Sequence, residues 1–159
     1  MQFPIGAIIV SAFAIIWVAA GTRKLPRPWL LVSVISTVVI SAALILVSSR
    51  ITPVHPVRFN PAAYNWSVVF EAFFIFLAIV ILRRAGRKDV LLPVISFIVG
   101  LHFCGMVWAL GSTMYYWVSG AMCAVAAATI AFVPPNLRDP VVGLGSAVIL
   151  WCAAIWSLF

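Results

Sequence analysis

Acidic side chains are almost absent from this chain. Its 159 residues include three Asp and Glu in all, and only 8% of the residues are charged. A soluble domain has about 25% charged and about 45–50% apolar residues, whereas this chain is 65% hydrophobic. A soluble core could not cover that much apolar surface. The composition therefore excludes an ordinary soluble protein and predicts an integral membrane protein.

Metal-ligand and disulfide patterns are also missing. The three cysteines, Cys104, Cys123 and Cys152, all lie inside apolar runs, and no CxxC motif occurs. Such cysteines usually act as small buried hydrophobes, so we expect neither a disulfide framework nor a zinc site. One deep histidine, His102, with Met106 on the same helix is a poor pair of haem ligands. We expect no metal site and no cofactor.

The basic residues are not arranged as a nucleic-acid interface. The formal net charge is +7, but the Lys and Arg residues stand between apolar runs. In that position they set membrane topology and contact anionic lipid head groups. No basic patch interleaved with aromatic residues lies outside the apolar runs, so we expect membrane lipids, and not nucleic acid, as partners.

Six apolar runs are long enough to cross a hydrocarbon core of roughly 30 Å, which takes about 20 helical residues. The predicted fold is all-α: a polytopic bundle of six transmembrane helices in a single transmembrane domain, residues 1–159. The first run lacks the basic flank of a signal peptide, so we expect a retained helix, with a re-entrant or interfacial element as the alternative. "GLGS" at 143–146 predicts a small-residue packing face. The runs cover about 4–21, 28–49, 62–82, 90–110, 114–133 and 140–159.

Loop charges predict the orientation. Eight of the ten Lys and Arg residues fall in the first, third and fifth loops, and only Arg50 and Arg58 fall on the other side. Cytoplasmic loops carry the excess of Lys and Arg. We therefore expect both termini outside, in a multi-pass protein of the inner (plasma) membrane. The eight are Arg23, Lys24, Arg27, Arg83, Arg84, Arg87, Lys88 and Arg138.

Two ionisable side chains lie deep in the predicted helices, Glu71 in the third and His102 in the fourth. The turn between these helices centres near Gly86, fifteen residues after Glu71 and sixteen before His102. Antiparallel helices rise equally along their axes, by about 1.5 Å per residue. The two side chains are therefore expected at one depth, in the outer half of the membrane. We predict that they hydrogen-bond directly or through one water.

Helical spacing adds further polar residues to this pair. Tyr64, Ser67 and Glu71 share one stripe of the third helix. Gly105 follows His102 on the fourth helix and allows a neighbour to approach closely. With Tyr115 at the start of the fifth helix, these residues predict a polar pocket that opens outward. The candidate ligand- or proton-binding residues are Glu71, His102, Ser67, Tyr64 and Tyr115.

Three functions remain open. An acid at the helix centre costs about 2.5–3.5 kcal/mol to insert, whereas intramembrane polar contacts return on average about 0.6 kcal/mol. This imbalance favours a role in binding or transporting a small apolar or amphipathic ligand, with possible proton linkage. The first alternative is a structural or assembly subunit of a larger membrane complex, whose polar pair only aligns helices; the possible protein partners are further copies of the chain, in a homo-oligomer, or a membrane complex partner. The second alternative is a lipid-modifying enzyme with His102 as acid or base. The sequence contains no convincing nucleophile, so it favours a protein that is not an enzyme. No catalytic residue is assigned.

The stretch "GLHFCGMVWALGSTMYYWVSGAM", residues 100–122, contains a "GLHF…YY..G" pattern. It resembles a pattern in uncharacterised small bacterial multi-span membrane proteins. The resemblance covers 23 residues and implies a small multi-span membrane protein, without an established activity.

The topology can be tested with reporter fusions. A reporter fused after Phe159 should be active outside, and one inserted at residues 86–89 should be active in the cytoplasm, because the basic third loop stays inside. Compartment-specific enzyme activity or fluorescence measures both. A cytoplasmic C-terminus would overturn either the six spans or the orientation.

Overall fold

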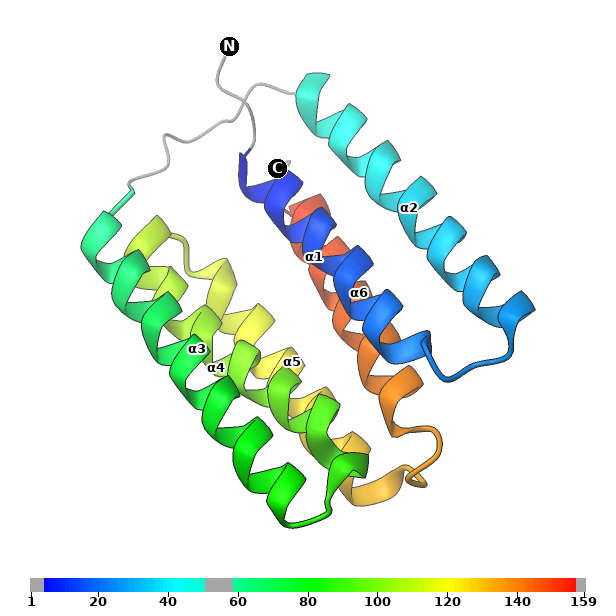
Figure 1. Ribbon diagram of the computed structural model, residues 1–159. Helices are drawn as coiled ribbons and strands as arrows, with labels where there is room; N and C mark the ends of the chain where they lie inside the picture. Colours follow the sequence, from blue (N-terminus) through cyan, green and yellow to red (C-terminus); the bar gives the residue numbers. More distant parts are fainter. Residues whose placement is uncertain (1–4, 51–58, 157–159) are drawn as a thin grey trace. The chain divides into compact units, whose positions relative to one another are not determined.

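The computed structural model describes residues 5–50 and 59–156, apart from the side chains of residues 5–7. In this part of the chain all regular structure is helical (Figure 1). Arg58 and the last three residues of the sixth predicted run lie outside the described residues. The elements are α1 (Ile5–Thr22), α2 (Arg27–Arg50), α3 (Pro61–Arg84), the 3-10 turn η1 (Lys88–Val90), α4 (Leu91–Leu110), α5 (Met114–Phe132) and α6 (Arg138–Trp156).

Local sequence signals explain where these helices begin and end. Asn60 caps α3: its side chain accepts a hydrogen bond from the Ala63 N–H at 3.2 Å, and Pro61 occupies the first turn. Gly86 and Gly111 follow α3 and α4 with φ of 69°, a conformation that glycine adopts without steric cost. The helices therefore end close to the predicted boundaries.

Five helical segments are long and apolar enough to cross a membrane: α2, α3, η1 with α4, α5 and α6. The remaining helix, α1, is apolar over the shorter stretch Ile8–Thr22. The described residues confirm the all-helical prediction, and the length and apolar composition of these segments indicate a membrane-embedded protein.

The chain divides into two compact units. The first unit comprises α1, α2 and the part of α6 from Gly143 onward. The second unit comprises α3, η1, α4, α5 and the first residues of α6. The single transmembrane domain stays a prediction.

The first unit brings two helix backbones into direct contact. A Cβ atom added to Gly143 of α6 would lie 2.7 Å from the carbonyl oxygen of Trp17 and 2.8 Å from the Cα atom of Gly21, both on α1. Neither backbone atom can rotate away. The structure thus confirms the expected small-residue packing face, because only glycine at position 143 permits this approach.

Several buried hydroxyl groups of the first unit form hydrogen bonds within their own helix or with an adjoining helix. Ser41 of α2 donates to the main-chain oxygen of Ser11 on α1 at 3.1 Å and accepts from the indole nitrogen of Trp151 on α6 at 3.2 Å. Thr22, Thr37 and Ser48 each donate to the carbonyl four residues earlier. In a membrane such bonds compensate the loss of water.

In the second unit α4 lies beside both α3 and α5 (Figure 1). The core residues Phe103, Val118, Met122 and Ala126 are buried on α4 and α5. α3 has no fully buried residue. It is therefore held mainly by the one stripe that faces α4.

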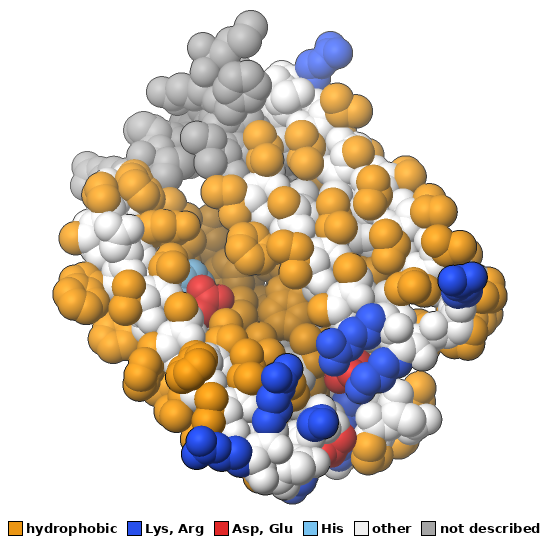
Figure 2. Space-filling model, in the orientation of Figure 1, with side chains coloured by type: hydrophobic (Ala, Val, Ile, Leu, Met, Phe, Trp, Pro, Cys, Tyr) orange, Lys and Arg blue, Asp and Glu red, His pale blue; other side chains and the backbone are white. Residues whose placement is uncertain are grey.

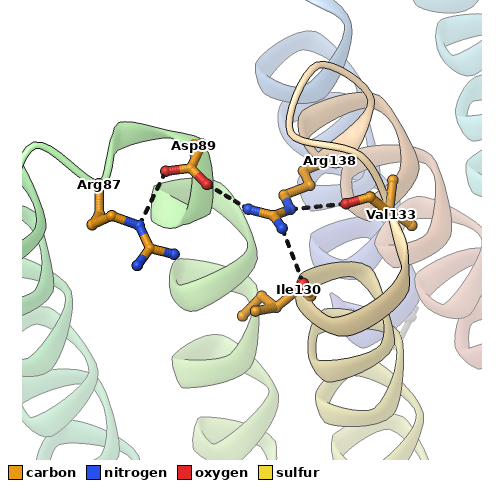
Figure 3. A network of polar contacts seen from close by, with 5 residues as sticks. All are labelled: Arg87, Asp89, Ile130, Val133 and Arg138. Atoms are coloured by element: carbon orange, nitrogen blue, oxygen red, sulfur yellow. Dashed lines mark hydrogen bonds and ion pairs between the residues drawn. The ribbon is translucent and has the colours of Figure 1, made fainter.

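Arg138 links the end of α5 to η1 in the second unit (Figure 3). The guanidinium of Arg138 donates to the carbonyls of Val133 at 3.0 Å and Ile130 at 3.1 Å, and it forms an ion pair with Asp89 of η1. Arg87 also pairs with Asp89, at 3.5 Å. The last carbonyls of a helix lack intrahelical partners, so Arg138 caps the end of α5 and joins it to η1. Figure 2 shows Lys and Arg side chains (blue) at the α3–η1 turn and hydrophobic side chains along the helix flanks of this unit.

A substitution of Gly143 by Ala should destabilise the first unit. The added methyl group meets backbone atoms of α1, so the free energy of unfolding should fall by about 1–3 kcal/mol, the usual cost of overpacking. Gly120→Ala is the matched control, because nothing lies within 4 Å of its added Cβ; a helical alanine there should be neutral or stabilising by about 0.5–1 kcal/mol. Unfolding in mixed micelles measures both. Equal stability of the two variants would contradict the α1–α6 contact.

Candidate functional site

One stripe of α3 faces α4. Tyr64, Ser67, Glu71 and Ile75 are all half-buried, whereas most positions between them are exposed. Their spacing of three or four residues places them on one side of a helix. This confirms the predicted stripe and fixes the rotation of α3, so that its acid points toward His102 on α4.

Gly105 sets the separation between α3 and α4. A Cβ atom on this residue would lie 3.1 Å from the Cβ atom of Ser67 and still closer to its hydroxyl oxygen. Any larger residue would press against Ser67. The glycine therefore brings the two helices close enough for polar atoms of α3 to reach His102, as the sequence predicts.

Three oxygen atoms of α3 surround one nitrogen of His102. The Nδ1 atom lies 3.0 Å from the hydroxyl of Ser67, 3.2 Å from the main-chain oxygen of Ser67 and 3.3 Å from Oε2 of Glu71. The predicted contact between carboxylate and imidazole is thus direct and is confirmed. The contribution of the Ser67 carbonyl was missed, because a residue pattern indicates side chains and not the main-chain oxygen that a given rotation exposes.

The contact between Glu71 and His102 joins a nearly buried side chain to a more exposed one. The side chain of His102 is 9% exposed and that of Glu71 is 20% exposed. Large apolar side chains on the outer flank of α3, including Phe70, Phe73 and Phe74, are exposed. Charges interact more strongly in such a low-dielectric setting than in water. The arrangement can share one proton between an acid and a base, and it leaves the carboxylate partly accessible.

The contact geometry does not match a Ser–His–acid triad. In a triad the acid holds one ring nitrogen, and the serine hydroxyl is hydrogen-bonded to the other. Here the hydroxyl of Ser67 and the carboxylate of Glu71 contact the same nitrogen. His102 is therefore not arranged to remove a proton from Ser67 through its second nitrogen, which counts against the enzyme alternative built on that serine.

The two predicted tyrosines take part in aromatic contacts. The ring of Tyr64 lies 5.6 Å from that of Phe59, and the ring of Tyr115 stacks on Phe103 at 6.0 Å with an interplanar angle of 8°. Phe103 in turn lies edge-on to His102, with centroids 5.9 Å apart. The structure thus joins Ser67, Glu71 and His102 by direct polar contacts, whereas ligand contacts by Tyr64 and Tyr115 stay a prediction. The phenylalanine link between Tyr115 and His102 had no signal in the residue spacing.

The cysteines of α4 and α5 lie at the contact between those helices. The Sγ atom of Cys104 is 3.1 Å from the hydroxyl of Ser119, and Cys123 donates to the carbonyl of Phe97 at 3.6 Å. Within residues 5–50 and 59–156, no three His, Cys, Asp or Glu side chains group as metal ligands.

Comparisons of the chain with protein-family models, curated proteins and solved structures found no match. The resemblance of residues 100–122 to small bacterial membrane proteins stays a prediction.

Replacing Gly105 by Ala should separate these helices and weaken the His102–Glu71 contact. The methyl group overlaps Ser67, so we expect a loss of about 1–3 kcal/mol in the free energy of unfolding. Ser67→Gly removes the overlapping atoms and should reduce the loss when it is combined with Gly105→Ala. A double-mutant cycle in mixed micelles measures the coupling between the two positions. Purely additive effects would contradict the close approach.

Proposed function

We propose that this chain is a six-span membrane protein of the inner (plasma) membrane with both termini outside. Five helical segments of sufficient length, and the shorter apolar α1, support the span count. The exposed Arg83, Arg84, Arg87 and Lys88 at the α3–η1 end of the second unit support a cytoplasmic position for that end.

The same protein binds or transports a small amphipathic ligand at the cluster of Ser67, Glu71 and His102. The observation that carries this proposal is the 3.3 Å contact between a carboxylate and an imidazole inside two apolar helices. Tyr64 and Tyr115 would complete the binding residues. An ionisable residue within a membrane segment normally marks a ligand, ion or proton site.

The energetic imbalance supports binding over mere helix alignment. Placing an acid at the centre of a membrane helix costs about 2.5–3.5 kcal/mol, and an intramembrane polar contact returns about 0.6 kcal/mol. A glycine–serine contact already fixes the distance between α3 and α4 without any charge. The Glu71–His102 pair therefore adds chemistry that packing of these helices does not require.

Proton exchange would accompany binding. A carboxylate and an imidazole in contact can hold one or two protons between them, and a ligand that contacts either group changes which state is favoured. Because Glu71 is 20% exposed and His102 is 9% exposed, the carboxylate is the more accessible of the two. Amphipathic compounds suit the site because exposed phenylalanines flank the acid on α3.

Ligand binding is tested by thermal stabilisation of the purified protein. Decylamine and 1-decanol serve as probes; a bound probe at 100 times its dissociation constant stabilises by about 2.7 kcal/mol. We expect the shift in melting temperature to disappear in Glu71→Gln and His102→Asn. The matched control Asp89→Asn also changes an acid to an amide but lies in η1, so it should keep the shift. If neither probe stabilises wild type, or if all variants respond alike, the proposal fails.

The outer flank of α3 favours a second candidate, an assembly subunit. α3 has no fully buried residue, and Phe70, Phe73, Phe74 and Phe76 are all exposed on it. Such a flank suits a neighbouring helix as well as lipid. Mass measurement of the protein in gentle detergent tests this role: a different protein bound in a fixed ratio supports it, and a lone chain or a homodimer contradicts it.

A further inference from the structure

The hydrogen-bonding groups around His102 restrict where its proton can reside. A carbonyl oxygen can only accept a hydrogen bond, and the carbonyl of Ser67 faces Nδ1 at 3.2 Å. The carboxylate of Glu71 faces the same atom at 3.3 Å. A bare Nδ1 lone pair would be opposed by the lone pairs of both groups. The neutral imidazole therefore carries its proton on Nδ1 in preference to Nε2.

The hydroxyl of Ser67 agrees with this assignment. It lies 3.3 Å from the main-chain oxygen of His102, to which it can donate its proton. Its lone pairs then remain for Nδ1–H, 3.0 Å away. Each donor in this cluster has an acceptor, and no two lone pairs are opposed.

Among the described residues, the second ring nitrogen of His102 has no hydrogen-bond partner. All contacts of the imidazole with polar atoms of the described residues involve Nδ1. With the proton on Nδ1, the Nε2 atom carries a lone pair that can accept a hydrogen bond. An unsatisfied acceptor within a membrane segment is costly, so a donor from outside the described protein residues would stabilise it.

We infer that Glu71 and Ser67 hold His102 in the Nδ1–H tautomer, so that Nε2 accepts a hydrogen bond from the ligand. This inference rests on the proposed binding function and names the ligand class: an amphipathic molecule with a hydroxyl or ammonium donor on an apolar chain. Glu71 and Ser67 are positioning residues in this arrangement, since they act through the imidazole. The same logic orients histidines in metal and catalytic sites, where the partner of one nitrogen decides the role of the other.

Nitrogen NMR of labelled histidine tests the tautomer without any ligand. The chain has two histidines, so His55→Gln leaves the signal of His102 alone. The protein is placed in lipid nanodiscs at a pH at which the imidazole is neutral. We expect a protonated Nδ1 and a bare Nε2 in this background. A majority of the Nε2–H tautomer would overturn the inference, whatever the protein binds.

Variants separate a positioning role from a merely structural one. Glu71→Gln adds an amide donor that can face Nδ1, so the fraction of the Nδ1–H tautomer should fall. Ser67→Ala keeps the main-chain carbonyl and should retain most of that fraction. Asp89→Asn should leave the spectrum unchanged. Identical tautomer fractions in Glu71→Gln and Asp89→Asn would contradict the role of Glu71.

A matched pair of probes tests the ligand class. 1-Decanol has a hydroxyl donor, and its methyl ether lacks one. 1-Decanol should produce a given rise in the melting temperature of the wild-type protein at a concentration at least tenfold lower than the ether requires. Equal effects would overturn the donor requirement. If neither compound binds, the binding function fails, while the tautomer measurement still decides the arrangement of His102.

Discussion

The close approach of α3 and α4 at Gly105 determines the rest of the site. The helices approach closely because Gly105 of α4 has no side chain that would press against Ser67 of α3. From this one contact follow the rotation of α3, the inward direction of Glu71 and the arrangement of three oxygens around a single imidazole nitrogen. Packing thus comes before electrostatics in this protein: small residues decide how near the helices lie, and polar atoms then find partners at that distance.

In both units a glycine allows two helices to approach closely, and a serine hydroxyl forms hydrogen bonds between helices, where a membrane offers few other polar partners. In the first unit, Gly143 brings α6 onto α1, and Ser41 links helices through a main-chain oxygen and an indole nitrogen. In the second, Gly105 brings α3 onto α4, and Ser67 contacts both the ring and the main chain of His102. In each unit the glycine permits the short distance between helices, and the serine hydroxyl forms hydrogen bonds across neighbouring helices. Hydroxyl groups can both donate and accept, which suits them to places where water is absent.

The positions of the helices and the pairing of Glu71 with His102 could be predicted from the sequence, because they depend on the length of the apolar runs and on helical periodicity. Apolar runs of about 20 residues locate helices, and equal distances from a tight turn place Glu71 and His102 at one depth. What spacing alone could not provide is which atoms meet: the main-chain oxygen of Ser67 and the stacking of Tyr115 on Phe103 depend on exact helix rotation and rotamers. The grouping of the helices into two compact units also had no signal in the residue spacing, since it depends on contacts between segments far apart in the chain, and the single transmembrane domain stays a prediction.

Arg138 illustrates how one side chain can serve at two stages in the life of a membrane protein. While the chain is inserted, a loop arginine acts as a plain positive charge that helps to retain its loop on one side. After folding, its guanidinium is occupied by two carbonyls of α5 and by Asp89, and only 14% of the side chain remains exposed. Most of the Arg138 side chain is then covered by its protein contacts. A count of basic residues therefore describes the unfolded chain better than the charge that the folded protein exposes.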